Sequence, residues 1–343
     1  MAWRNEPWFW TDDGVIPALI RTMLTPASSL YVLGQKIRAA TTNPYICPSP
    51  VICVGAASIG GAGKTPTALT LAELLATNYK NICFLTRGYR GDVKGPTFVA
   101  DHHTSNDVGD EALLLAQRCP TIVSANRAAG AKLAAENGAD LIIMDDGYQN
   151  PTLKKDVSIL LVDDSGLDQR QRVFPAGRLR EPIARAAARA DIIVRVSTTK
   201  PGAPITQGEE WPSKSSGAFF TTARTIPTRT IDSSRKYLAF SGIARPQRFI
   251  ASLKGAGLDL VDAVSFPDHH PFSETELSML RKRAADIGAT LITTEKDFVR
   301  LSQEQQDAIA TFGIEIAFDQ ATQLVQRISE TIGANRGMTS SNV

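Results

Sequence analysis

The 343-residue sequence is poor in cysteine and histidine and has no excess of either charge. Its cysteines (Cys47, Cys53, Cys83 and Cys119) show no CxxC spacing, and no Cys/His group has the spacing of a structural zinc site. Cys53 and Cys83 lie in apolar runs, where a reduced, buried thiol is expected. With 37 basic and 35 acidic residues, the chain lacks the concentrated positive charge that coats nucleic acid. We expect a globular protein of a reducing compartment that binds no nucleic acid.

The N-terminal segment, residues 1–45, also lacks an uninterrupted apolar run long enough to span a membrane, and it lacks the basic start of a signal peptide. Pro17, Arg21 and Pro26 interrupt the apolar run that begins at Val15. Three tryptophans among the first ten residues are typical of a segment at the headgroup level of a bilayer. Packing on the protein's own core is an equally good interpretation. We expect residues 1–45 to face a membrane without crossing it.

From about Pro50 the chain alternates short apolar runs with helical stretches, which predicts parallel βαβ units and a sheet covered on both faces. Strands are expected at residues 51–54, 81–85, 121–123, 141–144, 157–162 and 192–196, and helices at 67–75, 110–118 and 127–137. Residues 200–216 are rich in Pro, Gly, Ser and Thr and are expected to form a long loop. A second α/β pattern begins near residue 235 and includes a last strand at 314–317.

These patterns predict an α/β protein of two lobes with a cleft between them. The predicted divisions are a membrane-facing segment at 1–45, a first domain at 46–218, linker strands at 219–234, a smaller C-terminal α/β domain at 235–335 and a flexible tail at 336–343.

A glycine-rich sequence separates the predicted strand at 51–54 from the following helix. Its residues are Ser58, Ile59, Gly60, Gly61, Ala62, Gly63, Lys64, Thr65 and Pro66. Glycines let successive backbone N–H groups point at phosphate oxygens, and the helix N-terminus favours negative charge. Lys64 is expected to reach the β- and γ-phosphates, and the Thr65 hydroxyl to ligate Mg²⁺. Although Ser58 replaces the glycine of the strict pattern, the context predicts a P-loop NTPase-like parallel-sheet domain that binds a nucleoside triphosphate.

Two carboxylates, Asp145 and Asp146, follow the predicted strand at 141–144, at the sheet edge where α/β proteins bind ligands. Paired aspartates at a strand end often form turns. With a phosphate loop upstream, they are the best metal candidates, directly or through water. Glu111 is a further candidate.

Asp110 opens a predicted helix, where it can cap the helix or orient the hydroxyl that attacks the γ-phosphate. His269, in the second lobe, offers an imidazole that could pair with such an acid. Among the arginines that could bind phosphate, Arg180 is the best placed, because it and Glu181 lie between turn residues.

The ordered set of motifs resembles the tetraacyldisaccharide 4'-kinase family, the P-loop kinases of lipid A biosynthesis. The matching segments are residues 7–10, 60–66, 87–89, 109–112, 145–149, 175–177, 179–182, 266–269 and 294–297. The resemblance implies transfer of the γ-phosphoryl of ATP to the 4'-hydroxyl of a lipid A disaccharide 1-phosphate, with Mg²⁺. It also implies a peripheral position on the cytoplasmic face of the bacterial inner membrane. We expect the chain to be a monomer.

By this resemblance Asp110 and His269 together activate the sugar hydroxyl. Lys64, Arg180 and Glu181 would serve the same site. The nucleotide or the substrate would be contacted by Tyr89, Arg127, Gln149 and Asn150. Two residues depart from the family pattern: Asn150 replaces a usual histidine, and Ala56 replaces a usual asparagine.

The alternative from another class is a membrane-associated P-loop switch ATPase, which also combines a GKT loop with an amphipathic anchor. Its dimer-type loop often has a second lysine near the start, and no lysine occurs between Val51 and Gly63. A GTPase is disfavoured because residues 294–297 carry the elements of a guanine signature in the wrong order.

Overall fold

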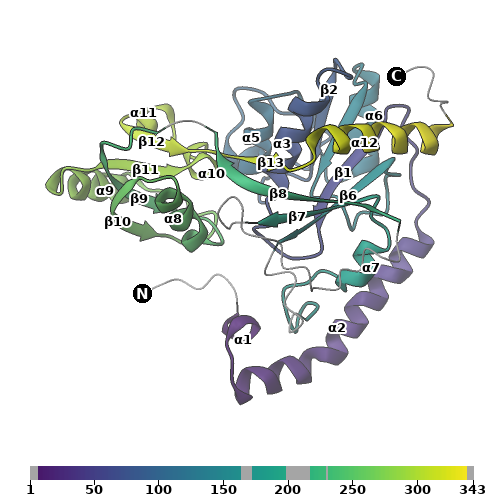
Figure 1. Ribbon diagram of the computed structural model, residues 1–343, viewed down its shortest axis with the longest axis horizontal. Helices are drawn as coiled ribbons and strands as arrows, with labels where there is room; N and C mark the ends of the chain where they lie inside the picture. Colours follow the sequence, from purple (N-terminus) through teal and green to yellow (C-terminus); the bar gives the residue numbers. More distant parts are fainter. Residues whose placement is uncertain (1–6, 164–171, 198–216, 229–230, 338–343) are drawn as a thin grey trace.

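The structure is a computed structural model that describes residues 7–163, 172–197, 217–228 and 231–337. Within these residues the chain forms a larger and a smaller α/β lobe, each built on its own sheet (Figure 1). Residues 200–216, for which a loop is predicted, and the tail from residue 338 lie outside the described residues.

The larger lobe contains a sheet of order β13-β8-β7-β6-β1-β5-β2-β4-β3. Its strands are β1 (Val51–Ala56), β2 (Ile82–Thr86), β3 (Thr97–Phe98), β4 (Thr121–Val123), β5 (Leu141–Asp145), β6 (Val157–Asp163), β7 (Ile192–Ser197), β8 (Phe219–Pro227) and β13 (Ile314–Phe318). All neighbours in this sheet are parallel except β3 with β4 and β13 with β8. Every residue of β1 and β5 is buried, as expected for continuous apolar runs in a parallel sheet.

Helices cover both faces of the larger sheet. On one face lie α3 (Lys64–Leu75), α5 (Asp110–Ala116) and α12 (Ala321–Arg336), and on the other α6 (Arg127–Glu136) and α7 (Ile183–Ala187); α4 (Ser105–Val108) precedes α5. Cys53 and Cys83 are free and buried between these layers. Burial raises the pKa of Cys53 to about 11 and that of Cys83 to about 12, so both thiols stay protonated at neutral pH, as the sequence predicts.

The smaller lobe has an all-parallel sheet of order β10-β9-β11-β12. Its elements are β9 (Lys236–Ser241), α8 (Pro246–Gly255), β10 (Asp259–Ser265), α9 (Glu274–Asp286), β11 (Thr290–Thr294), α10 (Glu295–Phe298), α11 (Gln303–Gln306) and β12 (Ile309–Phe312). α9 packs on one face of this sheet and α8 on the other. Each lobe is therefore held together by its own apolar clusters, one on each face of its sheet.

The predicted division at residues 219–234 and 235–335 needs correction, because the chain returns to the larger lobe after β12. β8 pairs with β7 inside the larger sheet, and β13 pairs with β8 rather than with the smaller sheet. The helix α12, which was not predicted, then packs Leu324, Ile328 and Ile332 on the larger core. Their spacing of four residues is a helical signal. The smaller lobe is thus an insertion between two neighbouring strands of the larger one.

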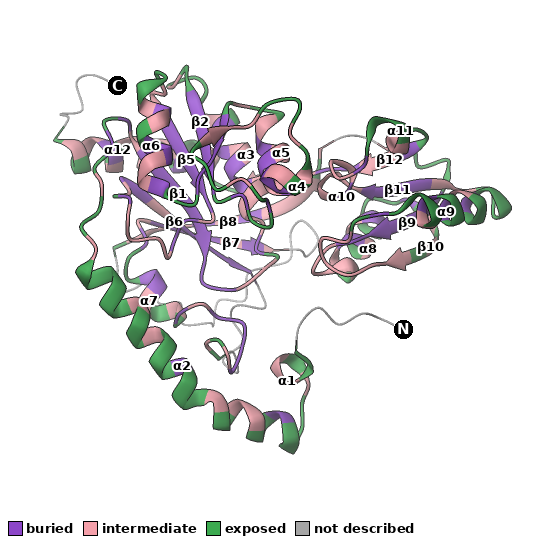
Figure 2. Ribbon diagram, turned by 180° about the vertical axis from the view of Figure 1, so that it is seen from behind, coloured by how far each residue is buried: buried purple, intermediate pink, exposed green. Residues whose placement is uncertain are grey.

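The N-terminal segment forms α1 (Trp8–Thr11) and the long helix α2 (Val15–Thr41). Pro17 and Pro26, which interrupt the apolar run in the sequence, do not break α2: Pro17 lies in the first turn, where its missing N–H is harmless, and Pro26 lies within the helix. Only Pro17 and Ser28 are buried among the described residues of α2, and Figure 2 shows most of this helix exposed. Packing of α2 on the protein's own core, the alternative interpretation, is therefore wrong for this helix.

The helix α2 is long and apolar enough to cross a membrane by length and composition alone. Its exposed apolar side chains include Val15, Ile16, Leu19, Met23, Leu30, Leu33 and Ile37. The opposite side of α2 is tied to the larger lobe, since Ser28 Oγ donates to Val173 O at 2.7 Å and Gln35 Nε2 to Arg180 O at 3.0 Å. An apolar stripe is thus held in place on the outside of the molecule.

Candidate functional site

The glycine-rich loop lies between β1 and α3, as predicted. Gly60, Gly61 and Gly63 have φ angles of 73°, 58° and 78°, in the left-handed region that glycine adopts without strain. Gly63 precedes α3, whose first turn contains Lys64, Thr65 and Pro66. The loop therefore has the strand–loop–helix geometry that directs backbone N–H groups at an anion.

A second segment, residues 178–180, supports the start of this loop. Ile59 N donates to Arg178 O at 2.8 Å, and Arg180 N donates to Ala57 O at 2.6 Å. Ser58 is buried and forms an antiparallel bridge with Leu179. Ser58 at this position is thus part of the loop's support.

Asp145, at the end of β5, lies beside the phosphate loop. Its Oδ2 accepts a hydrogen bond of 2.8 Å from Thr65 Oγ1, and its Oδ1 has no hydrogen-bond partner among the described residues. Burial, together with the neighbouring carboxylates of Glu111 and Asp146, raises the pKa of Asp145 to about 7. A divalent cation would relieve both the repulsion and the unsatisfied oxygen, so Thr65 and Asp145 fit a Mg²⁺ site. Among the described residues there is no group of three or more His, Cys, Asp or Glu side chains that could hold a metal ion.

Asp146 differs from Asp145 because two cations already bind it. Arg180 donates through Nη1 at 2.6 Å and Nη2 at 2.9 Å, and Lys64 Nζ lies 3.8 Å away. Although burial opposes ionisation, Lys64 and Arg180 hold the pKa of Asp146 below its usual range. Of the two predicted metal carboxylates, Asp145 therefore has the freer oxygen, and Asp146 positions Lys64 and Arg180.

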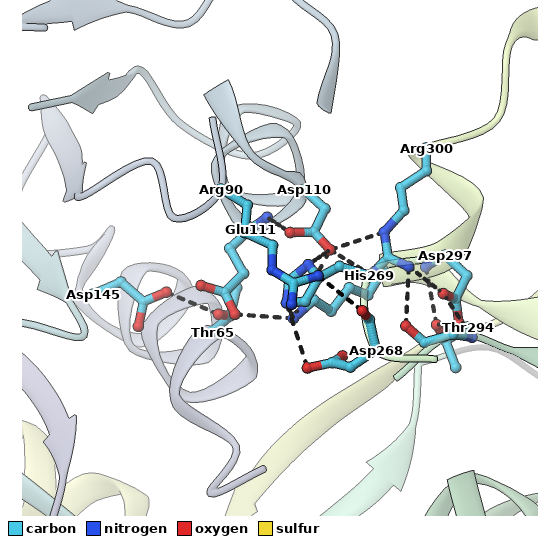
Figure 3. Close-up of polar contacts among 12 residues, drawn as sticks. Thr65, Arg90, Asp110, Glu111, Asp145, Asp268, His269, Thr294, Asp297 and Arg300 are labelled. Atoms are coloured by element: carbon cyan, nitrogen blue, oxygen red, sulfur yellow. Dashed lines mark hydrogen bonds and ion pairs between the residues drawn. The ribbon is translucent and has the colours of Figure 1, made fainter. Parts of the chain in front are cut away.

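Asp110 and His269 meet where the two lobes touch (Figure 3). His269 Nδ1 lies 3.0 Å from Asp110 Oδ2, and both side chains are nearly buried. The same Oδ2 accepts hydrogen bonds from Arg300 Nη2 at 2.5 Å and Nε at 3.0 Å. Burial opposes the negative charge, but the hydrogen bond from His269, with Lys296 and Arg300, holds the pKa of Asp110 well below its usual range. Asp110 is therefore an ionised acceptor in this contact.

Lys296 connects the same pair to Glu111. Lys296 Nζ lies 3.1 Å from Glu111 Oε1 and 3.4 Å from His269 Nε2. Burial lowers the pKa of Lys296, but the carboxylates of Glu111 and Asp110 outweigh it and raise the pKa. A charged Lys296 can only donate, so Glu111 is engaged by an ammonium group in this structure.

Arg300 and Lys296 are site residues that the sequence interpretation missed. Residues 294–297 were noted as a matching segment without a role. In the structure Thr294 caps α10 by accepting a 3.0 Å hydrogen bond from Asp297 N, and Asp297 in turn accepts from Arg300 Nη1 at 2.8 Å. The motif therefore holds α10, which carries Lys296, and its Asp297 fixes Arg300 just beyond the end of that helix.

Glu181, Gln149 and Asn150 lie away from the Asp110–His269 contact. Glu181 is buried and binds Arg189 at 2.7 and 2.9 Å and Gln149 Nε2 at 3.1 Å. Gln149 Nε2 also donates to Ala56 O at 3.0 Å. Asn150 Oδ1 accepts from Thr152 N and Oγ1, a local turn contact. Gln149 therefore connects Glu181 to the end of β1, and Asn150 stabilises its own turn.

Tyr89 and Arg127 occupy different environments. Tyr89 is exposed, and its ring packs edge-on against His269 at 5.6 Å between centroids. Arg127 is buried, and its Nη1 donates to Ser124 O at 2.7 Å. Burial, and then repulsion from Arg87, lowers the pKa of Arg127 to about 10. The structure therefore brings Tyr89 to the Asp110–His269 contact and places Arg127 within the larger lobe.

Comparison with known proteins gives a consistent result. The model of the family described as tetraacyldisaccharide-1-P 4'-kinase matches residues 20–333. A protein named tetraacyldisaccharide 4'-kinase from Parvibaculum lavamentivorans is 44% identical over 302 residues, which cover 87% of each chain. One of the same name from Methylorubrum extorquens is 40% identical over 330 residues, covering 95% of this chain and 98% of the relative. The crystal structure of LpxK from Aquifex aeolicus in complex with ATP has a TM-score of 0.72 and 28% identity, and the match covers 91% of this chain and 99% of that one.

Proposed function

We propose a function from one premise, that this chain belongs to the tetraacyldisaccharide 4'-kinase family. The chain transfers the γ-phosphoryl of ATP to the 4'-hydroxyl of a tetraacyldisaccharide 1-phosphate and gives the 1,4'-bisphosphate. The observation that carries this proposal is the 3.0 Å contact between Asp110 and His269 beside the phosphate loop. A nucleotide switch has no need of a base for a second substrate, so this contact favours the kinase over a switch ATPase.

In the proposed reaction His269 accepts the proton of the sugar hydroxyl. Because a carboxylate only accepts hydrogen bonds, Nδ1 of His269 carries a proton and Nε2 carries the lone pair. Lys296 donates to that lone pair here, and it can turn wholly to Glu111 when the hydroxyl arrives. The 4'-oxygen then bonds to the γ-phosphorus, the bond from that phosphorus to the β–γ bridging oxygen breaks, and the proton passes to Nε2. A positioned base of this kind contributes a factor of about 10²–10⁴.

Asp110 acts through His269. Arg300 keeps Asp110 ionised and fixed, so Asp110 holds the imidazole orientation and stabilises the imidazolium that forms. Lys64 neutralises charge on the β- and γ-phosphates, and Asp146 with Arg180 sets its position. Thr65 and Asp145 would hold Mg²⁺, which would supply positive charge to neutralise the phosphates of the nucleotide. Glu111 is the neighbouring carboxylate that could join it.

The chain is proposed to lie as a monomer on the cytoplasmic face of the inner membrane through α2. Spanning is disfavoured by geometry: Ser28 and Gln35 lie well inside the helix and contact the larger lobe, which a helix buried in lipid at those positions could not do. The exposed apolar side chains on α2 instead enter the headgroup region. An acylated substrate keeps its sugar at this level, within reach of the site.

The test is incubation of the full chain with γ-labelled ATP and the disaccharide 1-phosphate in mixed micelles. The expected product is a doubly phosphorylated lipid that carries the label. Release of labelled inorganic phosphate with no labelled lipid would instead support the switch ATPase. His269→Ala should lower the rate of label transfer by about 10²–10⁴ while ATP binding is retained.

A further inference from the structure

A cluster of two arginines and one aspartate joins the smaller lobe to the phosphate loop, on elements that the proposed mechanism does not use. Asp163, the buried last residue of β6, accepts from Arg245 Nη1 at 2.6 Å and from Arg248 Nη2 at 2.9 Å on the same oxygen, Oδ2. Both arginines come from the start of α8 in the smaller lobe. Two guanidinium groups therefore share one carboxylate oxygen, next to a loop built to hold anions.

Both arginines also touch the loop itself, at Gly61. Arg248 Nη1 donates to Gly61 O at 3.0 Å. Nε and Cζ of Arg245 lie 3.1 and 3.4 Å from the point where a Cβ on Gly61 would stand, so the guanidinium occupies the space that the missing side chain leaves. The two arginines thus contact the loop differently: Arg248 binds the carbonyl oxygen of Gly61, and Arg245 packs against the side-chain position of Gly61.

One nitrogen of the Arg245 guanidinium group donates no hydrogen bond to the described residues. Its Nη2 is buried and has no hydrogen-bond partner among the described residues. An unpaired buried guanidinium nitrogen is unfavourable, and planar guanidinium groups match phosphate oxygens well. Because Asp163 binds Nη1 of Arg245, the guanidinium group is held in place and its Nη2 lies beside the phosphate loop.

We propose that Arg245 is a phosphate ligand that the smaller lobe contributes to the nucleotide site, with Asp163 as its counterion and Arg248 as the support of the loop. The inference rests on the proposed function for the identity of the nucleotide. The 1-phosphate of the lipid offers similar chemistry, but contact with Gly61 favours the polyphosphate of the nucleotide, which this loop cradles.

The experiment is equilibrium titration of the full chain with ATP, and separately with AMP, without lipid. Arg245→Gln is expected to weaken ATP binding by about tenfold to a hundredfold, the range of one charge-assisted hydrogen bond, and to leave AMP binding unchanged. Arg248→Gln is the matched control, since it removes the Gly61 carbonyl contact and keeps the ligand; it should weaken ATP binding several-fold less. Equal losses in the two variants would overturn the proposal, because both arginines would then act through the loop's conformation. So would an unchanged ATP affinity in Arg245→Gln.

Three further measurements complete the test. If Arg245→Gln does not fold, as judged by thermal unfolding without nucleotide, Arg245→Lys replaces it: this variant keeps the charge and loses Nη2, and wild-type ATP affinity would overturn the proposal. The KM for the lipid at saturating ATP should not change in Arg245→Gln; a raised lipid KM with unchanged ATP affinity would assign Arg245 to the 1-phosphate instead. The ATP titration does not depend on turnover. If the chain binds ATP but phosphorylates no lipid, the proposed function is refuted, and the titration still tests the role of Arg245.

Discussion

His269 Nδ1 lies 3.0 Å from Asp110 Oδ2, and this contact places an imidazole of the smaller lobe on a carboxylate of the larger one. Because a carboxylate only accepts hydrogen bonds, the Nδ1 atom of His269 carries the proton in this contact. Arg300 binds the same oxygen and keeps Asp110 charged. The pair therefore combines one side chain from each lobe.

The first prediction concerns this pair. Asp110→Asn and His269→Ala should each reduce kcat by about 10²–10⁴, and the double variant should lose no more than about tenfold beyond the worse single one, because either change disables the same step. His270→Gln is the control, since His270 binds Glu276 at 2.9 Å and does not reach Asp110. Initial rates of 4'-phosphorylation measure the effect. Losses that multiply would show that the two residues act independently.

The second prediction concerns Arg300 and pH. The folded-state pKa of Asp110 is depressed, so its charge is present above that value and is lost as the pH falls through it. Arg300→Gln removes one cause of the depression, so the pKa should rise and activity should fail at a higher pH on acidification than in the wild type. Arg300→Lys should recover part of the shift. The profile of kcat/KM against pH decides this, and a uniform drop with no displacement of the acid limb would mean that Arg300 only supports the fold.

The third prediction concerns the exposed stripe on α2. Leu19→Glu with Met23→Glu replaces two exposed apolar side chains by charges and should lower liposome binding by at least about tenfold, because burial of one such side chain is worth about 1.5–3 kcal/mol. ATP affinity in solution should not change. Met279→Glu, an equally exposed position on α9, is the control. Flotation that persists in the double variant, or after removal of residues 1–30, would exclude α2 as the anchor.

The fourth prediction separates backbone strain from the arginine contact at the phosphate loop. Gly61→Ala and Gly138→Ala both place a Cβ at a positive φ, of 58° and 80°, and each should lower the free energy of unfolding by about 1–2 kcal/mol. Only Gly61 has a neighbour, Arg245, at 3.1 Å; nothing lies within 4 Å of a Cβ at Gly138. ATP affinity should therefore fall in Gly61→Ala alone. Chemical denaturation and nucleotide titration give the two quantities, and equal ATP affinity in both variants would contradict the prediction.

The local parts of this molecule could be predicted because each depends on neighbours in sequence. β1 and β5 are continuous apolar runs, and the loop at residues 58–66 combines glycines with a lysine at a fixed spacing. Asp145 could be placed because a strand's carboxyl end is where α/β sheets bind ligands. These features need no knowledge of the distant chain.

The remainder depends on contacts between distant segments. Arg180 binds Asp146 and so leaves an oxygen of Asp145 available. Lys296 and Arg300, which lie far from Asp110 in the sequence, are the cations next to it in the structure. From the sequence, β13 is expected to be one more strand of the second domain. Its pairing with β8 in the structure shows that it belongs to the larger sheet. The family resemblance supplied the link between Asp110 and His269 that residue spacing alone left open.

The insertion of the smaller lobe between β8 and β13 has a consequence for how the site is assembled. A lobe at a chain terminus is connected to the rest of the protein by one segment. The smaller lobe is connected by two, which lead to the adjacent strands β8 and β13 of the same sheet. Its approach to Asp110 is therefore an intramolecular event with a high effective concentration, restricted in direction by two neighbouring attachments. Loss of pairing between β8 and β13 would release His269, Lys296 and Arg300 from Asp110 together, as one body.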